Sequence, residues 1–357
     1  MKHQLATFVA AAFLAIPSVG AEPMHVKPRA VGKIERLDPL LDEIVDANAV
    51  VEVIAEGFQW SEGPVWHRKG NCLLFSDIPR NTVFRWSEKD GLEPYLDPSG
   101  YTGPGPRAGE TGQQSDVDEQ GSNGLAIDPK GRLVLCQHGD RRIARIDAPL
   151  AADAKPESKF TTLADRWEGK RFNSPNDLAL HSSGAVYFTD PPYGLMKGGD
   201  PSTQEIDFNG VYRVGPDGVV TLVTREMTKP NGIALSPDEK ILYVGQSDGE
   251  APLWRAFDVK ADGSVGPGRL LFNAKKLAEA GAHGAPDGFK LDVYGNLLAT
   301  GPGGVLVITP AGKHLGTIST GDLVANCAFG DDGSTLYMTS NTKLCRVKLK
   351  TKGAGFQ

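Results

Sequence analysis

Polar and apolar residues alternate along most of this chain, which is the pattern of half-buried β-strands. Many alternating runs occur in pairs joined by a short turn, as in GLAIDPKGRLVLCQ, DLALHSSGAVYFTD, GIALSPDEKILYVGQ and GFKLDVYGNLLATG. Third strands follow in TVFRW, RIARI, GVYRV and KLCRV, and fourth strands in EPYL, FTTLA, VTLVT and RLLFN. Helical periodicity is almost absent. The pattern therefore predicts an all-β protein built from four-stranded units.

These units repeat along the chain, and each opens with Asn, Asp or Glu, usually followed by Gly. The openings are Glu62 in SEGPVW, Asn123 in SNGLAI, Asn176 in PNDLAL, Asn231 in PNGIAL, Asp287 in PDGFKL and Asn326 in ANCAF. They lie about 40 to 60 residues apart, a period typical of propeller blades. Six units of four strands predict a six-bladed β-propeller.

The strand count also predicts how the ring closes. The last unit ends after LCRVKL without a fourth strand, whereas VVEVIAEGF, near residues 50–58, is a strand without a unit of its own. Pairing this N-terminal strand with the last blade would remove two exposed sheet edges. We therefore expect a propeller over residues 50–357, preceded by an extension over 22–49.

Two long polar segments interrupt the repeat, at residues 97–122 and 190–210. The first lies between the first two blades, and the second lies between two strands of the third blade. Long loops in a compact domain are often functional. We expect both to wall or cover the axial site, and surface insertions without a role are the alternative.

Residues 1–21 have the features of a secretory signal: Lys2, an apolar run over about residues 5–16, and small residues before Glu22. The apolar run is too short to span a bilayer comfortably, and no other segment approaches the length of a membrane helix. We expect a periplasmic or secreted protein without a membrane partner. The formal net charge of −6 and the lack of long basic runs argue against a nucleic-acid partner.

Four cysteines would then lie in an oxidising compartment, namely Cys72, Cys136, Cys327 and Cys345. As many as two disulfides are possible there. All four residues lie within apolar strands, however, so buried free thiols are the other possibility. The sequence does not decide between them.

In a closed ring the unit openings converge on the axis. Glu62 and Asp287 would supply carboxylates, and Asn176 and Asn231 would supply amide oxygens. Such hard oxygen ligands suit Ca²⁺, with Mg²⁺, Mn²⁺ or Zn²⁺ as alternatives. Asn123 is a candidate substrate contact at the same register, although Asn123 and Asn326 could also be turn residues or bind water.

Other polar residues lie near the same face. His138 in CQHGDRR follows a second strand, and histidine is a residue type suited to proton transfer near neutral pH. Asp190 and Tyr193 in TDPPYG are candidates for binding sugar hydroxyls. The segment GQSDG, residues 245–249, matches G-x-S-x-G, but a strand rather than a helix follows it, so a serine nucleophile is not expected.

Several motifs together resemble the SMP-30/gluconolactonase/LRE-like family, and its bacterial gluconolactonase branch in particular. They are WSEGPVW, RFNSPNDLAL, YFTDPPYG, KPNGIALSPDEKILYV and APDGFKLDVYGNLLATGPGGV. The resemblance implies a six-bladed propeller with one divalent metal held by Glu62, Asn176, Asn231 and Asp287. It also implies that Asp287 is the general base and that Arg171 binds substrate.

The activity implied by this resemblance is hydrolysis of a sugar lactone, such as glucono-1,5-lactone, to the aldonic acid. A metal-bound carboxylate is a weak base, so another group, such as His138, could share the proton transfer. Hydrolysis of aryl esters or organophosphates on the same propeller is an alternative, as is a non-catalytic metal-binding propeller. The sequence leaves open whether the protein is a monomer or a homodimer.

Overall fold

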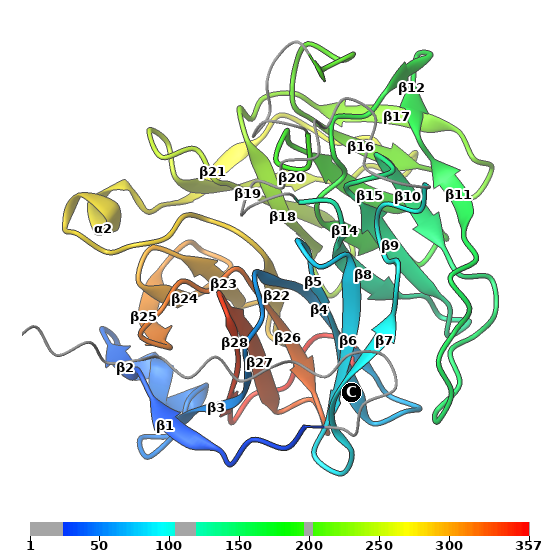
Figure 1. Cartoon of the computed structure of the whole chain (residues 1–357). Coiled ribbons are helices and arrows are strands. Elements are labelled where there is room, and N and C mark those ends of the chain that lie inside the picture. Colours follow the sequence, from blue (N-terminus) through cyan, green and yellow to red (C-terminus); the bar gives the residue numbers. More distant parts are fainter. Residues whose placement is uncertain (1–23, 104–118, 196–202, 357) are drawn as a thin grey trace, which may run out of the picture.

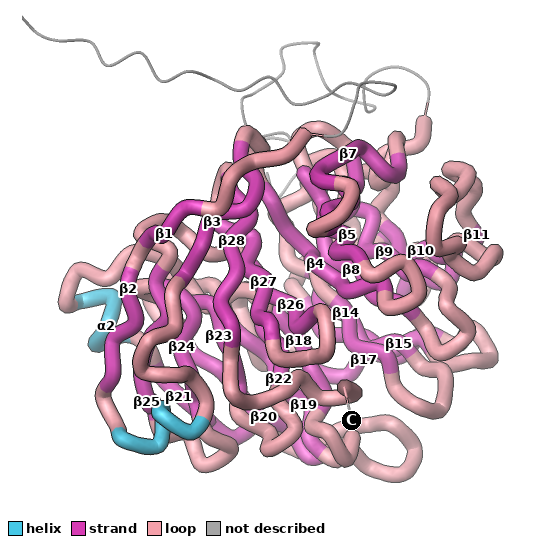
Figure 2. The backbone as a smooth tube through the Cα atoms, turned by 90° about the horizontal axis from the view of Figure 1, so that it is seen from below, coloured by secondary structure: helices cyan, strands magenta, loops and turns pink. Residues whose placement is uncertain are grey.

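The computed structural model describes residues 24–103, 119–195 and 203–356. Strands dominate it (Figure 2), and the helical elements that lie wholly within these ranges are η1 (Pro39–Glu43) and α2 (Lys275–Glu279). No helix in the described ranges is long and apolar enough to cross a membrane. The predicted all-β class is confirmed.

Six sheets follow one another around a common centre (Figure 1), which confirms the predicted six-bladed propeller. Blade one comprises β4 (Ser61–His67), β5 (Cys72–Asp77), β6 (Thr82–Ser87) and β7 (Gly91–Leu96). Blade two comprises β8 (Ser122–Ile127), β9 (Leu133–Gln137), β10 (Arg142–Arg145) and β11 (Thr161–Ala164). Blade three comprises β14 (Leu178–Leu180), β15 (Val186–Asp190), β16 (Gly210–Val214) and β17 (Val220–Thr224). Blade four comprises β18 (Pro230–Leu235), β19 (Ile241–Gln246), β20 (Leu253–Asp258) and β21 (Arg269–Asn273). Blade five comprises β22 (Phe289–Leu291), β23 (Leu297–Gly301), β24 (Gly304–Ile308) and β25 (His314–Ser319). Blade six comprises β26 (Asn326–Gly330), β27 (Thr335–Ser340) and β28 (Lys343–Lys348), together with β3 (Val51–Glu56).

The N-terminal strand β3 closes the ring, as predicted. It pairs antiparallel with β28, where Glu56 lies opposite Lys343 and Glu52 lies opposite Arg346. The last blade thus takes its outer strand from the beginning of the propeller. This pairing satisfies backbone groups that would otherwise form exposed edges.

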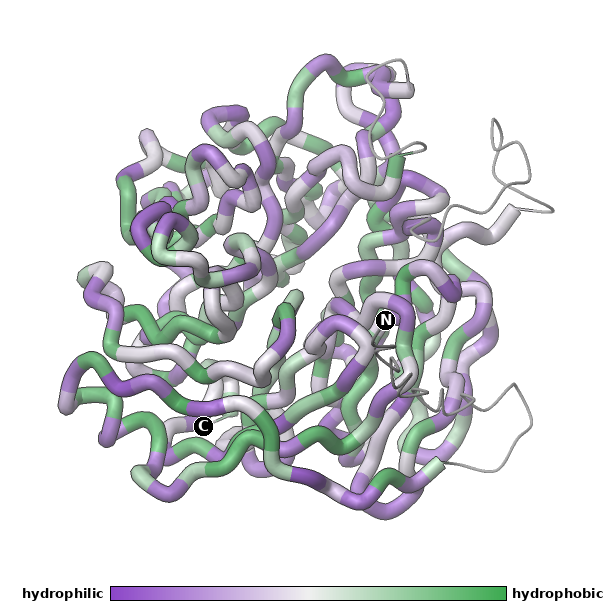
Figure 3. The backbone as a smooth tube through the Cα atoms, turned by 60° about the vertical axis from the view of Figure 1, so that its left-hand side comes forward, coloured by the Kyte–Doolittle hydropathy of each residue, from purple (hydrophilic) through white to green (hydrophobic). Residues whose placement is uncertain are grey.

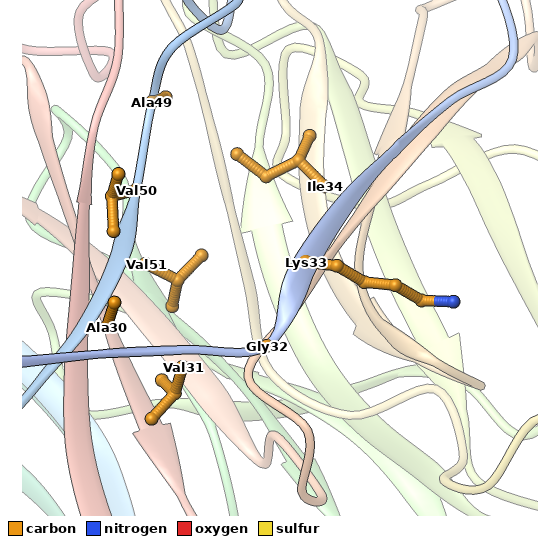
Figure 4. A pocket seen from close by; sticks show the side chains of 8 residues that line it. All are labelled: Ala30, Val31, Gly32, Lys33, Ile34, Ala49, Val50 and Val51. Carbon is orange, nitrogen blue, oxygen red and sulfur yellow. The ribbon is translucent and has the colours of Figure 1, made fainter.

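The N-terminal extension adds strands that the sequence pattern did not predict. β1 (Arg29–Val31) pairs with β3, and β2 (Lys33–Arg36) pairs with β25, so blades six and five each gain a fifth strand. A cavity of about 470 Å³ lies beside them, between residues 30–34 and 49–51 (Figure 4). Another small hairpin, β12 (Arg166–Trp167) with β13 (Lys170–Arg171), stands outside the blades.

The core lies between neighbouring blades, because each sheet packs on both faces. The second strands β5 and β27 are accordingly buried at every residue. Apolar and polar stretches alternate along the chain (Figure 3). Between blades one and six, the rings of Trp66 and Tyr337 stack with centroids 5.5 Å apart. The innermost strands are thereby fixed around the axis, which positions the candidate site.

Candidate functional site

The six residues that open the blades lie at the inner strands, as the repeat predicted. Glu62, Asn123, Asn231 and Asn326 belong to strands, whereas Asn176 and Asp287 come just before β14 and β22. Five of the six are no more than 4% exposed, and Asp287 keeps some exposure. The structure thus gathers buried oxygen-bearing side chains on inner strands that contact one another around the ring.

Local irregularities in the inner strands set the direction of these side chains. The pairing shifts register between Glu62 and Val65, between Ser122 and Leu125, and between Pro230 and Ile233. Such bulges turn a side chain away from the normal alternation of a strand. In blades three and five the regular strand begins only after the polar residue. In these five blades, the direction of the axial side chain is therefore not set by the alternation of the regular strand that follows it.

The glycine that follows four of the six opening residues has a packing reason. A Cβ atom at Gly63 would lie 1.9 Å from the backbone oxygen of Asn123 in the next blade. At Gly232 it would lie 2.1 Å from the oxygen of Asp287, and at Gly288 it would lie 1.9 Å from Cγ of Asn326. Only glycine permits this close approach. The recurring Asn-Gly and Asp-Gly pairs thus record contact between neighbouring blades.

Hydrogen bonds connect the axial residues across blade boundaries. The amide of Asn326 in blade six donates to Oε2 of Glu62 in blade one, with Nδ2 and Oε2 3.0 Å apart. In blade four, Nδ2 of Asn231 lies 2.8 Å from Oγ of Ser247, and that hydroxyl donates to the carbonyl of Pro286. Ser247 therefore links Asn231 to the residue before Asp287.

Several buried oxygen atoms at the centre have no hydrogen-bond donor among the described residues. They are Oδ1 of Asn123, Asn231 and Asp287, and Oδ2 of Asp177. Buried polar atoms normally have partners, and these four are all acceptors. No three His, Cys, Asp or Glu side chains in the described ranges form a metal-binding group by themselves. An ion at this centre would need the amide oxygens, and a hard divalent cation fits such a donor set.

Burial and mutual repulsion raise the proton affinity of the central carboxylates. Burial, opposed in part by the Gly63 backbone amide, raises the pKa of Glu62 to about 8, and nearby Asp177 contributes to the rise. The pKa of Asp287 is raised well above its usual value by burial and then by Glu62. A bound cation would offset this cost by neutralising the carboxylates.

Three residues near this centre were missed by the sequence analysis. Asp177 replaces the glycine of the repeat in PNDLAL, is 2% exposed, and belongs to the same electrostatic cluster as Glu62 and Asp287. The replacement of glycine by aspartate at this position could have identified Asp177 as a candidate from the sequence. Ser247 lay in a motif considered only for a nucleophile. Glu119 lies in the segment 97–122 that was expected to wall the site, but no feature of the sequence singled out this residue.

His138 directly follows β9, the second strand of blade two, as the sequence predicted. Its ring is fully buried, and Nδ1 lies 3.2 Å from Oε2 of Glu119, at ion-pair distance without hydrogen-bond alignment. Neither ring nitrogen has a hydrogen-bond partner among the described residues. Since Glu119 also acts electrostatically on Glu62 and Asp287, the pair belongs to the same polar region.

Tyr193 and Arg171 come to different places. The Tyr193 side chain lies close to Ser247 and Asp287. Burial followed by the charge of Asp287 raises its pKa, so Tyr193 lies at the axial cluster. Arg171 is on β13, and its Nη2 donates to the Asp140 carbonyl oxygen at 3.1 Å. The contacts of Arg171 connect it to the His138 turn, and no contact joins it to the axial residues in the described ranges.

Asp190 is fully buried at the end of β15. Its Oδ2 accepts from the backbone N–H of Asn173 at 2.8 Å, and burial raises its pKa to about 7. Asp77 has the same position in blade one and accepts from the backbone of Gln59 and Trp60. In both blades a carboxylate fixes the segment that leads into an inner strand. The contacts of Asp190 thus position Asn176, and its role in substrate binding stays a prediction.

The two long segments lie where the sequence placed them, after β7 and after β15. Residues 104–118 and 196–202 of these segments lie outside the described residues, as do the predicted signal residues 1–21. Within the described part, Glu119 reaches His138, and Asn81 anchors residues 99–101 through Oδ1. The predicted covering role is untested.

The fold and its polar centre define a β-propeller with an axial site. The model of the SMP-30/Gluconolactonase/LRE-like region matches residues 60–342, and the chain belongs to this family. This confirms the resemblance inferred from the motifs.

Among named relatives, a gluconolactonase of Zymomonas mobilis is 41% identical over 339 residues, which cover 94% of this chain and 91% of that protein. The regucalcin of Pongo abelii is 27% identical over 80% of this chain and 85% of its own length. A solved gluconolactonase structure from Xanthomonas campestris has a TM-score of 0.76 and 31% identity, and covers 91% of this chain and 98% of that one.

Proposed function

We propose that this protein hydrolyses a sugar lactone, glucono-1,5-lactone or a related aldonolactone, to the aldonic acid. The observation that carries the proposal is the group of buried acceptor oxygens without donors at the centre of a gluconolactonase-like propeller. The 41% identity to the Zymomonas mobilis gluconolactonase extends over nearly the whole chain. The relatives and the site therefore favour the same class of reaction.

The residues proposed to hold a divalent cation are Glu62, Asn176, Asn231 and Asp287, and Ca²⁺ is the expected ion. Their oxygen donors and the two carboxylates suit a hard ion of charge +2. When bound, such an ion supplies a Lewis acid that polarises the lactone carbonyl. The chain is similar to regucalcins, and the solved regucalcin of Agrobacterium tumefaciens is described as a calcium-binding protein, which agrees with this assignment.

Two groups of this chain are proposed to move protons. Asp287 keeps some exposure, has an oxygen without a donor, and has a raised pKa, which suits removal of a proton from the attacking water. His138 is the second candidate. Glu119 beside its Nδ1 would orient the ring and leave Nε2 to exchange a proton.

Four residues are proposed to bind the sugar, namely Arg171, Asn123, Asp190 and Tyr193. Tyr193 is supported by its proximity to Ser247 and Asp287. Asn123 is supported by the unpartnered Oδ1. Arg171 is supported only by its position near the His138 turn. The partner is thus a small molecule, and the protein itself would be a monomer or a homodimer.

The test is pH-stat hydrolysis of glucono-1,5-lactone by protein that has been chelated and then refilled with Ca²⁺, Zn²⁺ or Mn²⁺. We expect chelation to abolish the rate above the spontaneous background and one of the ions to restore it. Asp287→Asn should lower kcat by at least about 100-fold, the usual contribution of a general base. Asp262→Asn, in an exposed turn, is the matched control and should keep the wild-type rate.

Failure would have a definite meaning. Folded protein that accelerates lactone hydrolysis with none of the ions contradicts the proposal. Turnover of 4-nitrophenyl acetate or paraoxon would then favour the alternative activity, hydrolysis of aryl esters or organophosphates. A metal that raises the melting temperature without any turnover would favour a non-catalytic binding propeller.

We also propose that the protein is exported and loses residues 1–21. The basic start, the apolar run and the small residues before Glu22 support this. N-terminal sequencing of protein from the periplasmic fraction should give Glu22 as the first residue. A cytoplasmic protein that still begins at Met1 contradicts it.

A further inference from the structure

A second cavity lies on the propeller axis, away from the axial oxygens. It measures about 870 Å³, within the range of small-molecule sites. Residues from all six inner strands line it, among them Val65, Ile127, Leu180, Leu235, Lys290 and Ala328. Each lies a few residues further along its strand than the polar opening residue. The cavity is therefore the opposite end of the central channel, and we call it the basal cavity.

The wall of the basal cavity is mainly apolar, and its polar inner-strand residues are His67 and Lys290. Val65, Ile127, Leu180, Leu235 and Ala328 are aliphatic. The polar residues are His67, buried at the end of β4, and Lys290 on β22. Lys290 is half-buried, and its Nζ donates to the carbonyl of Phe289 at 3.1 Å. No carboxylate of the described residues forms an ion pair with it. A cation on an apolar wall is costly unless an anion accompanies it.

The rim of the basal cavity is also positively charged. Arg68, Lys69 and Lys130 line it, and neither lysine has an ion pair among the described residues. The one carboxylate in the lining, Asp128, already accepts from Arg132 with Nε and Oδ2 2.7 Å apart. Arg68 donates to the carbonyl of Gly355 and lies 4.0 Å over the ring of Phe356, which attaches the C-terminal segment to the rim.

The two ends of the channel thus differ in the ionisable groups that line them. Glu62, Asp177 and Asp287 place carboxyl groups at the end of the channel that holds the axial oxygens, which we call the upper end. Lys69, Lys130 and Lys290 of the basal cavity have no ion pair within the described ranges. Lys290 stands between the two ends, close enough to act on the charge of Asp177. An anion would therefore be attracted to the basal cavity, where the cations lie.

We propose that the basal cavity binds a small carboxylate with an apolar body, such as a medium-chain or aryl acid. The carboxylate would pair with Lys290, and the apolar body would cover the aliphatic residues Val65, Ile127, Leu180 and Leu235. A sugar is a poor occupant because these walls offer few hydrogen-bond partners. The assignment does not depend on the lactonase activity.

The test is calorimetric titration of the full protein with sodium octanoate and with uncharged octanamide. Wild type should bind one octanoate and should bind it more tightly than octanamide. Lys290→Met, which keeps the length of the side chain, should weaken octanoate binding by about tenfold, as expected for a charge-assisted hydrogen bond, and leave octanamide binding unchanged. Lys260→Met, in an exposed turn, is the matched control and should bind both as wild type does.

Two further variants keep the test decisive if Lys290→Met does not fold. The double variant Lys69→Met with Lys130→Met changes only exposed rim residues and should weaken octanoate binding by about threefold. Leu235→Glu adds a negative charge to the wall and should abolish octanoate binding. Thermal unfolding would establish that each variant is folded.

Lactone turnover separates this site from the upper one. Saturating octanoate should leave the hydrolysis of glucono-1,5-lactone unchanged. Competitive inhibition, with octanoate binding unaffected by Leu235→Glu, would place the anion at the upper end and overturn the proposal. Folded wild type that shows no octanoate binding, or Lys290→Met that binds it as wild type does, would overturn it as well.

Discussion

The side-chain amide of Asn326 donates to Oε2 of Glu62 across 3.0 Å, although the two residues are 264 positions apart in the chain. This bond joins the last blade to the first at the axis. Further out, β28 pairs with β3, the N-terminal strand that leads along the chain into blade one. The ring is therefore closed at two radii. Because Glu62 is a proposed metal ligand, ring closure and the state of the site are connected.

Gly288→Ala should break this connection. The new Cβ would lie 1.9 Å from Cγ of Asn326, so the amide must move away from Glu62. We expect the free energy of unfolding to fall by about 1–3 kcal/mol, as for other overpacked interiors, and lactonase activity to fall at least about tenfold. Urea unfolding and the pH-stat assay would measure both effects.

Gly249→Ala is the control for that experiment, since nothing lies within 4 Å of its added Cβ. It should retain wild-type stability and rate. Wild-type activity in Gly288→Ala would contradict the importance of the Asn326–Glu62 bond.

Ser247→Ala should weaken metal binding without unfolding the protein. The hydroxyl accepts from Nδ2 of Asn231 at 2.8 Å, and this contact leaves Oδ1 as the atom without a partner. Loss of such a supporting contact typically lowers metal affinity about 10- to 100-fold. Titration calorimetry of chelated protein with Ca²⁺ would measure it.

Two comparisons make the Ser247 result specific. Ser247→Thr keeps a hydroxyl and should have a smaller effect, whereas Ser264→Ala, in an exposed turn, should have none. Equal Ca²⁺ affinity in Ser247→Ala and wild type would show that Ser247 does not position Asn231.

Asp190→Asn should change how stability depends on pH. Burial raises the pKa of Asp190 from 3.8 to about 7, so between these values the native state holds a proton that the unfolded state has lost. The contribution of Asp190 to the free energy of unfolding therefore decreases as pH rises from about 4 to about 7, and is constant above that. The asparagine cannot ionise, so the variant should lack this decrease.

Urea unfolding at several pH values between 5 and 8 would test this difference. Arg141, which acts on Asp190 electrostatically, should remain charged throughout that range. Asp262→Asn is the control, because the pKa of Asp262 is lowered and its titration lies below the range. Parallel curves for Asp190→Asn and wild type would contradict the prediction.

The four cysteines should be free and unreactive in the native protein. All are buried and unpaired, and burial raises the pKa of Cys72 to about 11 and those of Cys327 and Cys345 to about 12. A thiol reagent such as 5,5′-dithiobis(2-nitrobenzoic acid) at pH 8 should find none in the folded protein. It should find four after denaturation without reductant, and a lower count would reveal a disulfide.

The local chemistry of the chain predicted most of the fold. Strand alternation, turns and the repeated openings such as Asn231-Gly232 are properties of neighbouring residues, so they can be recognised without a structure. The unpaired strand near residues 50–58 revealed ring closure by counting alone. The extension strands β1 and β2 were missed because three- and four-residue strands carry too little alternation to be recognised.

For the site, the sequence by itself determined which residues open the blades, and so which oxygens could meet at the axis. Only the tertiary structure decided which of them are bonded and which are left without donors, as for Asn326 with Glu62 and for Oδ1 of Asn231. It also brought in Asp177, Ser247 and Glu119, and set Lys290 at the other end of the channel. The physical reason is that alternation and turn chemistry act between near neighbours, whereas partners in different blades meet only when the ring closes.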